Sequence, residues 1–423
     1  MDQSNYENQE VCQEGSQEIE TPGRQQRVKV MNKDRVGKLI FFTALTIELL
    51  ILLIDKSAIT NPIEGRLFQI TFLLFAMKIC MTQYTNGEWI VLILFEALGA
   101  ISYLATGRNE IIRIVTMIAA CRDMNGRAVF SYMFKVVFGG CMLLVLLSLA
   151  GVLGTVSVTG IFRGDMVETR YCLGMGHPNA LHGMFFMLVL LFLYLYGSSM
   201  KKYWLAVLFA MNIGMFLLTG SKTGMLGTAF AIVFSALMIC IPRLRQSSLL
   251  YGMTALLLLV CTGIAWIAAA FSKEVPYHPA VWQLDRLLSG RIVNLYYDSA
   301  SHAGTLPTWT LFGVTENEYY FDLGWVRLFY WYGIIPAVIY VIILSLLIRE
   351  LYKEKEYMGV MMLASLFIYT LVEAHIISVY LARDYTLFLI GMCFGPMFHV
   401  DKGEKEYFWQ IPGMLFKRTG DSG

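Results

Sequence analysis

Charged residues are scarce in this sequence. Only 15% of its 423 residues are Asp, Glu, Lys or Arg, and 57% are hydrophobic, whereas soluble proteins carry about 25% charged residues. The net charge of +2 gives no reason to expect a nucleic-acid partner. Because the apolar residues come in runs of roughly 18 or more, the composition excludes an ordinary soluble enzyme and predicts a polytopic membrane protein.

Motifs for metals, cofactors and disulfides are also missing. The eight cysteines are scattered, with no CxxC pair and no cluster of Cys and His. Most lie in apolar runs, where a thiol packs as a small hydrophobic group, and only Cys172 is expected to face outward. No DxD-type motif stands in an outward segment. We therefore expect neither a metal nor another cofactor, and no extracytoplasmic disulfide.

About twelve apolar segments are candidate membrane spans, so the expected fold is an all-α polytopic membrane protein. The fourth segment is short and contains Arg113, which suggests a helix facing the bundle interior or lying near the interface. The expected spans cover residues 38–54, 66–84, 89–106, 110–121, 129–153, 180–197, 203–219, 224–241, 250–271, 325–348, 358–379 and 385–399.

Lys and Arg gather in every second connection between these spans. Cytoplasmic loops attract such residues, so an even number of spans places both termini in the cytoplasm. We expect residues 1–37, rich in Gln and Glu, to form a disordered tail, followed by a membrane domain at 38–400 and a second tail at 401–423. The basic residues in these connections are Arg122, Arg127, Lys201, Lys202, Arg243, Arg245, Arg349, Lys353 and Lys355.

Two long segments then face outward, at residues 154–178 and 272–324. The second lies between spans nine and ten and is the longest connection in the chain. It contains Trp282 and Trp309 together with several tyrosines, which makes it too aromatic for a disordered spacer. We expect it to form a folded cap with amphipathic helices on the outer leaflet.

Basic and polar side chains stand where several spans meet the outward segments. A guanidinium fork matches phosphate oxygens, and helices beginning after Asn179 and Thr223 would add backbone N–H donors, so these groups suit a pyrophosphate. Lys and Arg near helix ends also commonly extend to lipid headgroups, and both interpretations stay open. The outward candidates are Arg163, Arg170, His177, Ser221, Lys222, Arg286, Arg291, His302, Asp322, Arg327 and Arg383.

Glu373 and His375 lie inside the expected span 358–379. Ionisable groups at such positions are functional candidates by default. Glu373 can equally be a structural partner of an arginine, and the sequence does not decide between the two roles.

An ordered set of motifs resembles the O-antigen ligase/polymerase superfamily, and within it the repeat-unit polymerases of Gram-positive capsule and exopolysaccharide loci. Lys222 stands where that family usually has arginine, which keeps the charge but loses the bidentate fork, and Leu323 replaces the usual asparagine after Asp322. Glu373 matches a glutamate common in the penultimate span. The motifs are GHPN at 176–179, TGSKTG at 219–224, LLSGR at 287–291, LFG at 311–313 and FDLGWVRLFYWYG at 321–333.

The resemblance implies a GT-C-like membrane glycosyltransferase that is inverting and independent of metals. Its substrate would be an undecaprenyl-pyrophosphate-linked oligosaccharide, polymerised at the outer face of a bacterial plasma membrane, with a flippase and a chain-length regulator as pathway partners. In this hypothesis the catalytic residues are Arg291, Arg170, His177 and Glu373, and the general base is His177, Glu373 or His302. Substrate binding falls to Arg163, Asn179, Ser221, Lys222, Arg286, His302, Asp322, Arg327 and Arg383.

Two other classes of protein remain open at this point. A ligase that moves finished glycan onto another acceptor would need the same kind of site. A flippase for the lipid-linked unit would also need about twelve spans and a basic cavity. Such transporters usually have two similar halves, and this sequence contains no internal repeat.

Overall fold

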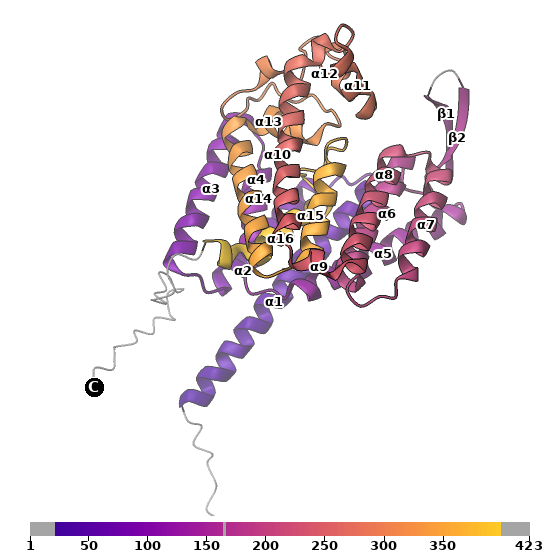
Figure 1. Ribbon diagram of the computed structural model, residues 1–423. Helices are drawn as coiled ribbons and strands as arrows, with labels where there is room; N and C mark the ends of the chain where they lie inside the picture. Colours follow the sequence, from indigo (N-terminus) through magenta and orange to yellow (C-terminus); the bar gives the residue numbers. More distant parts are fainter. Residues whose placement is uncertain (1–21, 164–165, 399–423) are drawn as a thin grey trace, which may run out of the picture.

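A computed structural model of the protein describes residues 22–163 and 166–398, with side chains for 33–161 and 167–398. Helices run back and forth between two ends of the molecule (Figure 1). Seven of those described are long and apolar enough to cross a membrane, and three further apolar helices are shorter. Many leucines on them are exposed, among them Leu104, Leu217 and Leu259. These features confirm the expectation of a mostly helical, multi-pass membrane protein.

The first five helices correspond to the first five expected spans. α1 begins at Pro22, so residues 22–37, for which we expected no fold, are helical. α3 begins with a capping box in which Thr85 and Glu88 satisfy each other's backbone N–H groups. The five are α1 (Pro22–Asp55), α2 (Glu64–Met81), α3 (Asn86–Thr106), α4 (Glu110–Ala120) and α5 (Gly126–Leu149).

A β-hairpin follows α5, an element that the all-α expectation does not contain. Its antiparallel strands β1 (Ser157–Arg163) and β2 (Met166–Tyr171) pair Ser157 with Tyr171. The hairpin projects from the same end of the bundle as α11 (Pro279–Leu287) and α12 (Arg291–Tyr297) (Figure 1). The next helices are α6 (Pro178–Tyr196), α7 (Tyr203–Thr219), α8 (Lys222–Cys240), α9 (Pro242–Gln246) and α10 (Ser248–Phe271).

A cap covers the end of the bundle between α10 and α13. Trp309 stacks on Phe329 with ring centroids 4.5 Å apart, and Trp266 of α10 meets both rings edge-on. These aromatic contacts tie the cap to the helices below it. The elements are η1 (Ser272–Glu274), α11 (Pro279–Leu287), α12 (Arg291–Tyr297), η2 (Leu306–Thr308) and α13 (Gly324–Tyr332).

Two of the expected spans were predicted as continuous helices, and that prediction is wrong. The segment 325–348 is two helices, because the chain breaks at Gly333 between α13 and α14. The segment 358–379 is helical only as far as Tyr369, so Glu373 and His375 lie in an irregular segment outside any helix, not within a span. The last elements are α14 (Ile334–Lys353), α15 (Tyr357–Tyr369), η3 (Leu381–Arg383) and α16 (Tyr385–Phe398).

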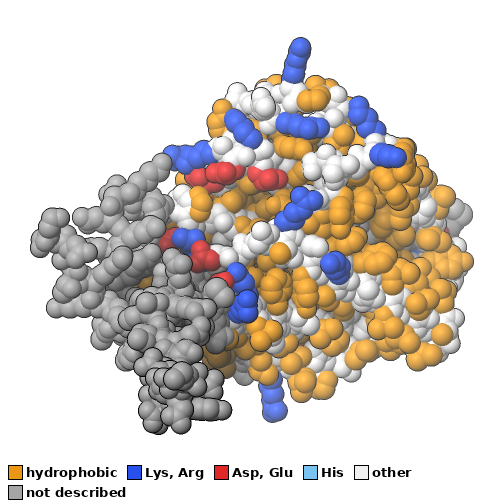
Figure 2. All heavy atoms as spheres, turned by 90° about the horizontal axis from the view of Figure 1, so that it is seen from below, with side chains coloured by type: hydrophobic (Ala, Val, Ile, Leu, Met, Phe, Trp, Pro, Cys, Tyr) orange, Lys and Arg blue, Asp and Glu red, His pale blue; other side chains and the backbone are white. Residues whose placement is uncertain are grey.

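Side-chain contacts show which loops between helices lie together at each end of the bundle. At the cap end, Arg383 after α15 pairs with Asp55 at the end of α1. At the other end, Arg245 of α9 lies over the ring of Tyr357, and Lys355 lies near Tyr251. Figure 2 shows this other end, where Lys and Arg side chains are spread over a mostly apolar face.

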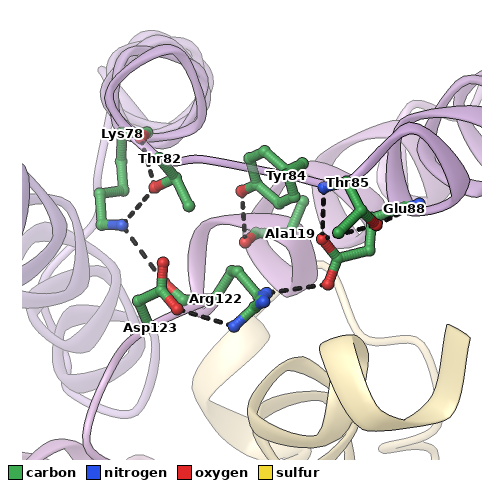
Figure 3. A network of polar contacts seen from close by, with 8 residues as sticks. All are labelled: Lys78, Thr82, Tyr84, Thr85, Glu88, Ala119, Arg122 and Asp123. Carbon is green, nitrogen blue, oxygen red and sulfur yellow. Dashed lines mark hydrogen bonds and ion pairs between the residues drawn. The ribbon is translucent and has the colours of Figure 1, made fainter. Parts of the chain in front are cut away.

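A polar network fastens α2, α3 and α4 at the end opposite the cap (Figure 3). The Arg122 Nε donates to Glu88 Oε1 at 3.0 Å, and the Tyr84 hydroxyl donates to the Ala119 carbonyl at 2.9 Å. Glu88 is fully buried, and its negative charge is compensated by Arg122 and by the backbone N–H of Thr85. Because Arg122 lies in the turn between α4 and α5, this ion pair fastens that turn to the start of α3.

The break at Gly333 is imposed by close backbone packing. Gly333 has φ +91° and ψ 172°, which side chains do not tolerate. A Cβ there would lie 2.4 Å from the Gly313 nitrogen and 2.6 Å from the Leu311 carbonyl oxygen. The N–H of Ile334 donates to the Thr310 carbonyl at 2.9 Å. The break therefore fastens the LFG segment of the cap to the start of α14.

We predict that Gly333→Ala destabilises the protein by about 2 kcal/mol or more, because the substitution adds both backbone strain and a steric clash. The expected result is a clear fall in the melting midpoint of the purified protein. Gly214→Ala is the matched control, since a Cβ at that helical position meets nothing within 4 Å. Equal melting of the Gly333→Ala variant and the wild type would contradict the packing described above.

Candidate functional site

A polar cavity of about 280 Å³ lies at the cap end, where α1, α6, the chain entering α13, the segment 370–384 and the start of α16 converge. His177 and Asn179 line it from the start of α6, and Asp322 and Tyr320 from the chain entering α13. Its other polar lining residues are Lys56, Tyr369, Glu373, His375, Arg383 and Tyr385. The cavity therefore joins residues that are far apart in the sequence, five of which were expected to act together: His177, Asn179, Asp322, Glu373 and Arg383.

α13 holds the irregular segment that carries Glu373 and His375. The N–H of Gly324 donates to the Thr370 carbonyl at 3.1 Å. The Trp325 indole donates to the carbonyl of Phe367 at 3.2 Å, and the Tyr332 hydroxyl to that of Ile377 at 3.1 Å. Carbonyls in and after the last turn of α15 are thus satisfied by the backbone and the side chains of a neighbouring helix.

Arg327 belongs to this support. We expected it to bind substrate, but its side chain is buried and donates to the Ala374 carbonyl. Its guanidinium lies 4.4 Å from the ring centroid of Trp331, and Arg327 does not line the polar cavity. Arg327 therefore positions the neighbours of Glu373.

Arg291 lies between two carboxylates. Its Nη2 is 3.3 Å from Asp322 Oδ2 and 3.8 Å from Glu373 Oε1. The Thr223 hydroxyl at the start of α8 donates to the same Glu373 oxygen at 3.0 Å. Three elements, α8, α12 and the segment after α15, are thereby joined at Glu373.

Burial raises the pKa of Glu373 to about 7, and the nearby Asp322 charge acts in the same direction. Arg291 and the Thr223 hydroxyl oppose the shift without cancelling it. Glu373 lies beyond the end of α15, and its side chain is 16% exposed. A carboxyl group with this pKa exchanges a proton readily near neutral pH, as a general acid or base must.

His177 caps α6 with its ring. Its Nδ1 accepts from the N–H of Asn179 at 3.1 Å, and Pro178 occupies the first turn. The accepting Nδ1 is unprotonated, so the proton of the neutral ring is on Nε2. Burial, followed by the Arg170 charge, lowers the pKa of His177 and favours this neutral form. The ring is thus placed to donate a hydrogen bond.

Lys56 and Asp55 were absent from our sequence-based site. Asp55 Oδ2 is 3.1 Å from Lys56 Nζ and also pairs with Arg383. Burial, followed by the Arg383 charge, lowers the pKa of Lys56. The sequence contained one indication of this pair, because Asp55 and Lys56 follow the first long apolar run at its expected outward end.

A second, larger cavity of about 780 Å³ adjoins the first. Tyr369 lines both cavities, and Thr223, which lines the larger one, touches Glu373. Lys222 and Arg286 give it two positive charges, and Arg286 lies over the ring of Trp282 at 4.7 Å. Asp285 gives it one negative charge and accepts from the first N–H groups of α12. The apolar lining comes from Leu226, Leu287, Leu288, Ile368, Leu371 and Val372. We call this second cavity the groove.

Ser221, Arg170 and His182 support the start of α8. Ser221 is its N-cap, accepting from the N–H of Gly224 at 3.4 Å. Arg170 pairs with Glu168 at 2.7 Å and packs on Gly220 in the same turn. The fully buried His182, which our sequence analysis did not identify, is hydrogen-bonded to Thr219 and Asn212 of α7 at 3.1 and 2.9 Å.

Among the predicted site residues whose side chains the structure describes, Arg170, Ser221, Arg291, Arg327 and His302 do not line either cavity. His302 stacks on Tyr296 at 3.9 Å, and its Nδ1 is 2.7 Å from the Tyr296 carbonyl oxygen, so it is engaged within the cap. Arg163 ends β1, and its side chain lies outside the described residues. The general base therefore has two candidates at the cavity, His177 and Glu373.

Within the part of the chain that the structure describes, no three His, Cys, Asp or Glu side chains come together as a metal site would require. Comparisons of the chain with protein-family models, with curated protein sequences and with solved structures gave no match.

The raised pKa of Glu373 predicts a pH-dependent stability. The folded protein holds this proton up to about pH 7, whereas an unfolded glutamate releases it near pH 4.3. The stabilising contribution is therefore fully present below about pH 4.3 and is lost as the pH rises through about 7. We expect the melting midpoint of wild type, minus that of Glu373→Gln, to decrease from pH 5 to pH 8. A constant difference would contradict the raised pKa.

Proposed function

We propose that the protein is a metal-independent membrane glycosyltransferase that polymerises undecaprenyl-pyrophosphate-linked oligosaccharides into a capsular or exopolysaccharide. The observation that carries the proposal is that two cavities share Tyr369 in their lining and meet beside Glu373, which lines the first and contacts Thr223 of the second. One is polar and suits a glycan, and the other is mostly apolar with Lys222 and Arg286 on its lining. A lipid-linked sugar pyrophosphate needs both environments.

The proposed protein has about twelve spans and both termini in the cytoplasm of a bacterium, with the cap and both cavities outside the plasma membrane. The distribution of Lys and Arg supports this orientation. Connections at the end opposite the cap contain pairs such as Arg122 and Arg127, Lys201 and Lys202, and Arg243 and Arg245. Lipid-linked glycans would reach the groove laterally from the outer leaflet.

In the proposed reaction, a hydroxyl of the acceptor glycan attacks the anomeric carbon of the donor. A bond forms between that oxygen and the carbon, the bond to the phosphate oxygen breaks with inversion, and undecaprenyl pyrophosphate leaves with the electron pair. Arg291 and Lys222 stabilise the charge that develops on the leaving group. The acceptor proton passes to Glu373 and then to water.

Glu373 is the proposed general base in preference to His177. A base needs a free lone pair, and the Nδ1 lone pair of His177 is engaged by the N–H of Asn179. Its Nε2 bears the remaining proton and can only donate in that state. Glu373 has a pKa near neutrality and touches Thr223, which lines the groove.

Purified protein incubated with a lipid-linked repeat unit should give a ladder of longer lipid-linked products. Arg291→Ala should abolish the ladder and Arg291→Lys should restore it only in part, because lysine keeps the charge but not the planar fork. Arg243→Ala is the matched control and should leave the ladder unchanged, because Arg243 is an exposed arginine of α9 at the end opposite the cap. A full ladder from Arg291→Ala at normal protein level would contradict the role of Arg291.

The same incubation separates the competing functions. A single transfer onto an acceptor that is not itself a lipid-linked unit would identify a ligase. Movement of the labelled unit between the leaflets of a vesicle, with no new glycosidic bond, would identify a flippase. Either outcome would replace the polymerase proposal.

Glu373→Gln should lower the turnover rate about 100-fold or more while leaving substrate affinity nearly unchanged, since proton transfer by a positioned base contributes 10²–10⁴-fold. In the wild type the rate should rise with pH through about 7, where the base loses its proton. His177→Asn, which retains a capping side chain, should keep this pH profile. A wild-type profile in Glu373→Gln would assign the base elsewhere.

A further inference from the structure

The cations at the polar cavity are unequally neutralised. Arg291 faces two carboxylates, Asp322 and Glu373. Lys56 and Arg383, which line the same cavity, share the carboxylate of Asp55 as an ion-pair partner. The charge of Glu373 also acts on Lys56, but a pKa of about 7 leaves Glu373 partly protonated near neutral pH. The two cations are therefore only partly neutralised. Lys56 is 20% exposed and Arg383 is 12% exposed, so water screens their charges only in part.

Hydrogen-bonding groups beside this pair also lack partners. Within the described residues, His375 Nδ1 and Arg383 Nε are buried and make no hydrogen bond. His375 contacts the Tyr369 ring edge-on at 5.3 Å. Buried polar groups without partners are uncommon in native proteins and call for an explanation. Turning these side chains toward the cavity would break no hydrogen bond at either atom.

The neighbouring charges keep His375 neutral. Burial, followed by the positive charges of Arg383, Lys56 and Arg327, holds its pKa well below the ordinary value. A neutral imidazole adds a hydrogen bond without a further charge. Two cations and a neutral ring around an open volume match the charge and hydrogen-bonding groups of a single anionic group.

We propose that Lys56, Arg383 and His375 form an anion-binding pocket for a phosphate or carboxylate group of the glycosyl substrate. The identity of the substrate rests on the proposed function, whereas the pocket rests on the charges and unpartnered atoms. The group is either a pyrophosphate headgroup or the carboxylate of an acidic sugar. The adjoining groove has its own positive side chains, Lys222 and Arg286, which do not line this cavity.

The test measures binding to the purified full-length protein by calorimetry. The probes are inorganic pyrophosphate, a hexuronic acid trisaccharide and the neutral trisaccharide made by reducing its carboxyl groups. At least one anionic probe should bind more tightly than the neutral one. Binding of pyrophosphate would identify a headgroup site, and binding of the hexuronate would identify an acidic sugar.

Lys56→Met should weaken binding of that anionic probe about tenfold or more, the usual effect of losing a charged hydrogen bond. Asp55 keeps Arg383 as its partner in this variant, so the fold should survive. Lys56→Arg should restore binding, and Lys201→Met, at the opposite end of the bundle, should not change it. The anion-binding proposal would be overturned if the neutral and anionic probes bound equally well, or if Lys56→Met bound the anionic probe with unchanged affinity.

Binding is measured without turnover, which separates the two proposals. If Lys56-dependent binding is present but no glycan is ever extended, the pocket stands and the glycosyltransferase proposal fails. If the ladder forms normally with Lys56→Met and that variant binds the anion as the wild type does, the pocket fails and the glycosyltransferase stands.

Discussion

The arrangement of the cap end depends on satisfying the irregular backbone after α15. A helix in an apolar environment satisfies its own N–H and C=O groups, whereas a chain that leaves the helix must find other partners. α13 supplies them through the backbone of Gly324 and the side chains of Trp325, Arg327 and Tyr332. Glu373 and His375 have defined positions because the carbonyls around them are held in this way.

The same packing explains the raised pKa and the polar contacts of Glu373. Glu373 is buried by the same packing that holds its backbone, and burial is the largest cause of its raised pKa. Arg291 reaches it from the cap, and Thr223 reaches it from the start of α8. A displacement of α13 would therefore alter the proton affinity and the contacts of Glu373 together, although α13 provides no catalytic group.

Much of the candidate site could be predicted from residue type alone. His177, Asn179, Asp322 and Glu373 are polar residues at the boundaries of apolar runs, and the structure brings them to one cavity. Lys56 was missed because a charged residue at the end of an apolar run is usually explained by a water-exposed position. Arg327 and His302 were assigned to substrate because sequence cannot tell a guanidinium or imidazole engaged by a backbone carbonyl from one that faces a cavity.

By itself the sequence determined that the chain is helical and crosses a membrane, because long apolar runs with few charges have no other stable form. It also indicated which connections are rich in Lys and Arg. Only the tertiary structure decided where the helices are interrupted, because the break at Gly333 and the early end of α15 depend on backbone contacts between distant segments. The ion pairs also depend on the tertiary structure. Arg291 pairs with Asp322 and Glu373, and Lys56 and Arg383 share Asp55, because the packed helices bring these distant residues within reach and bury them.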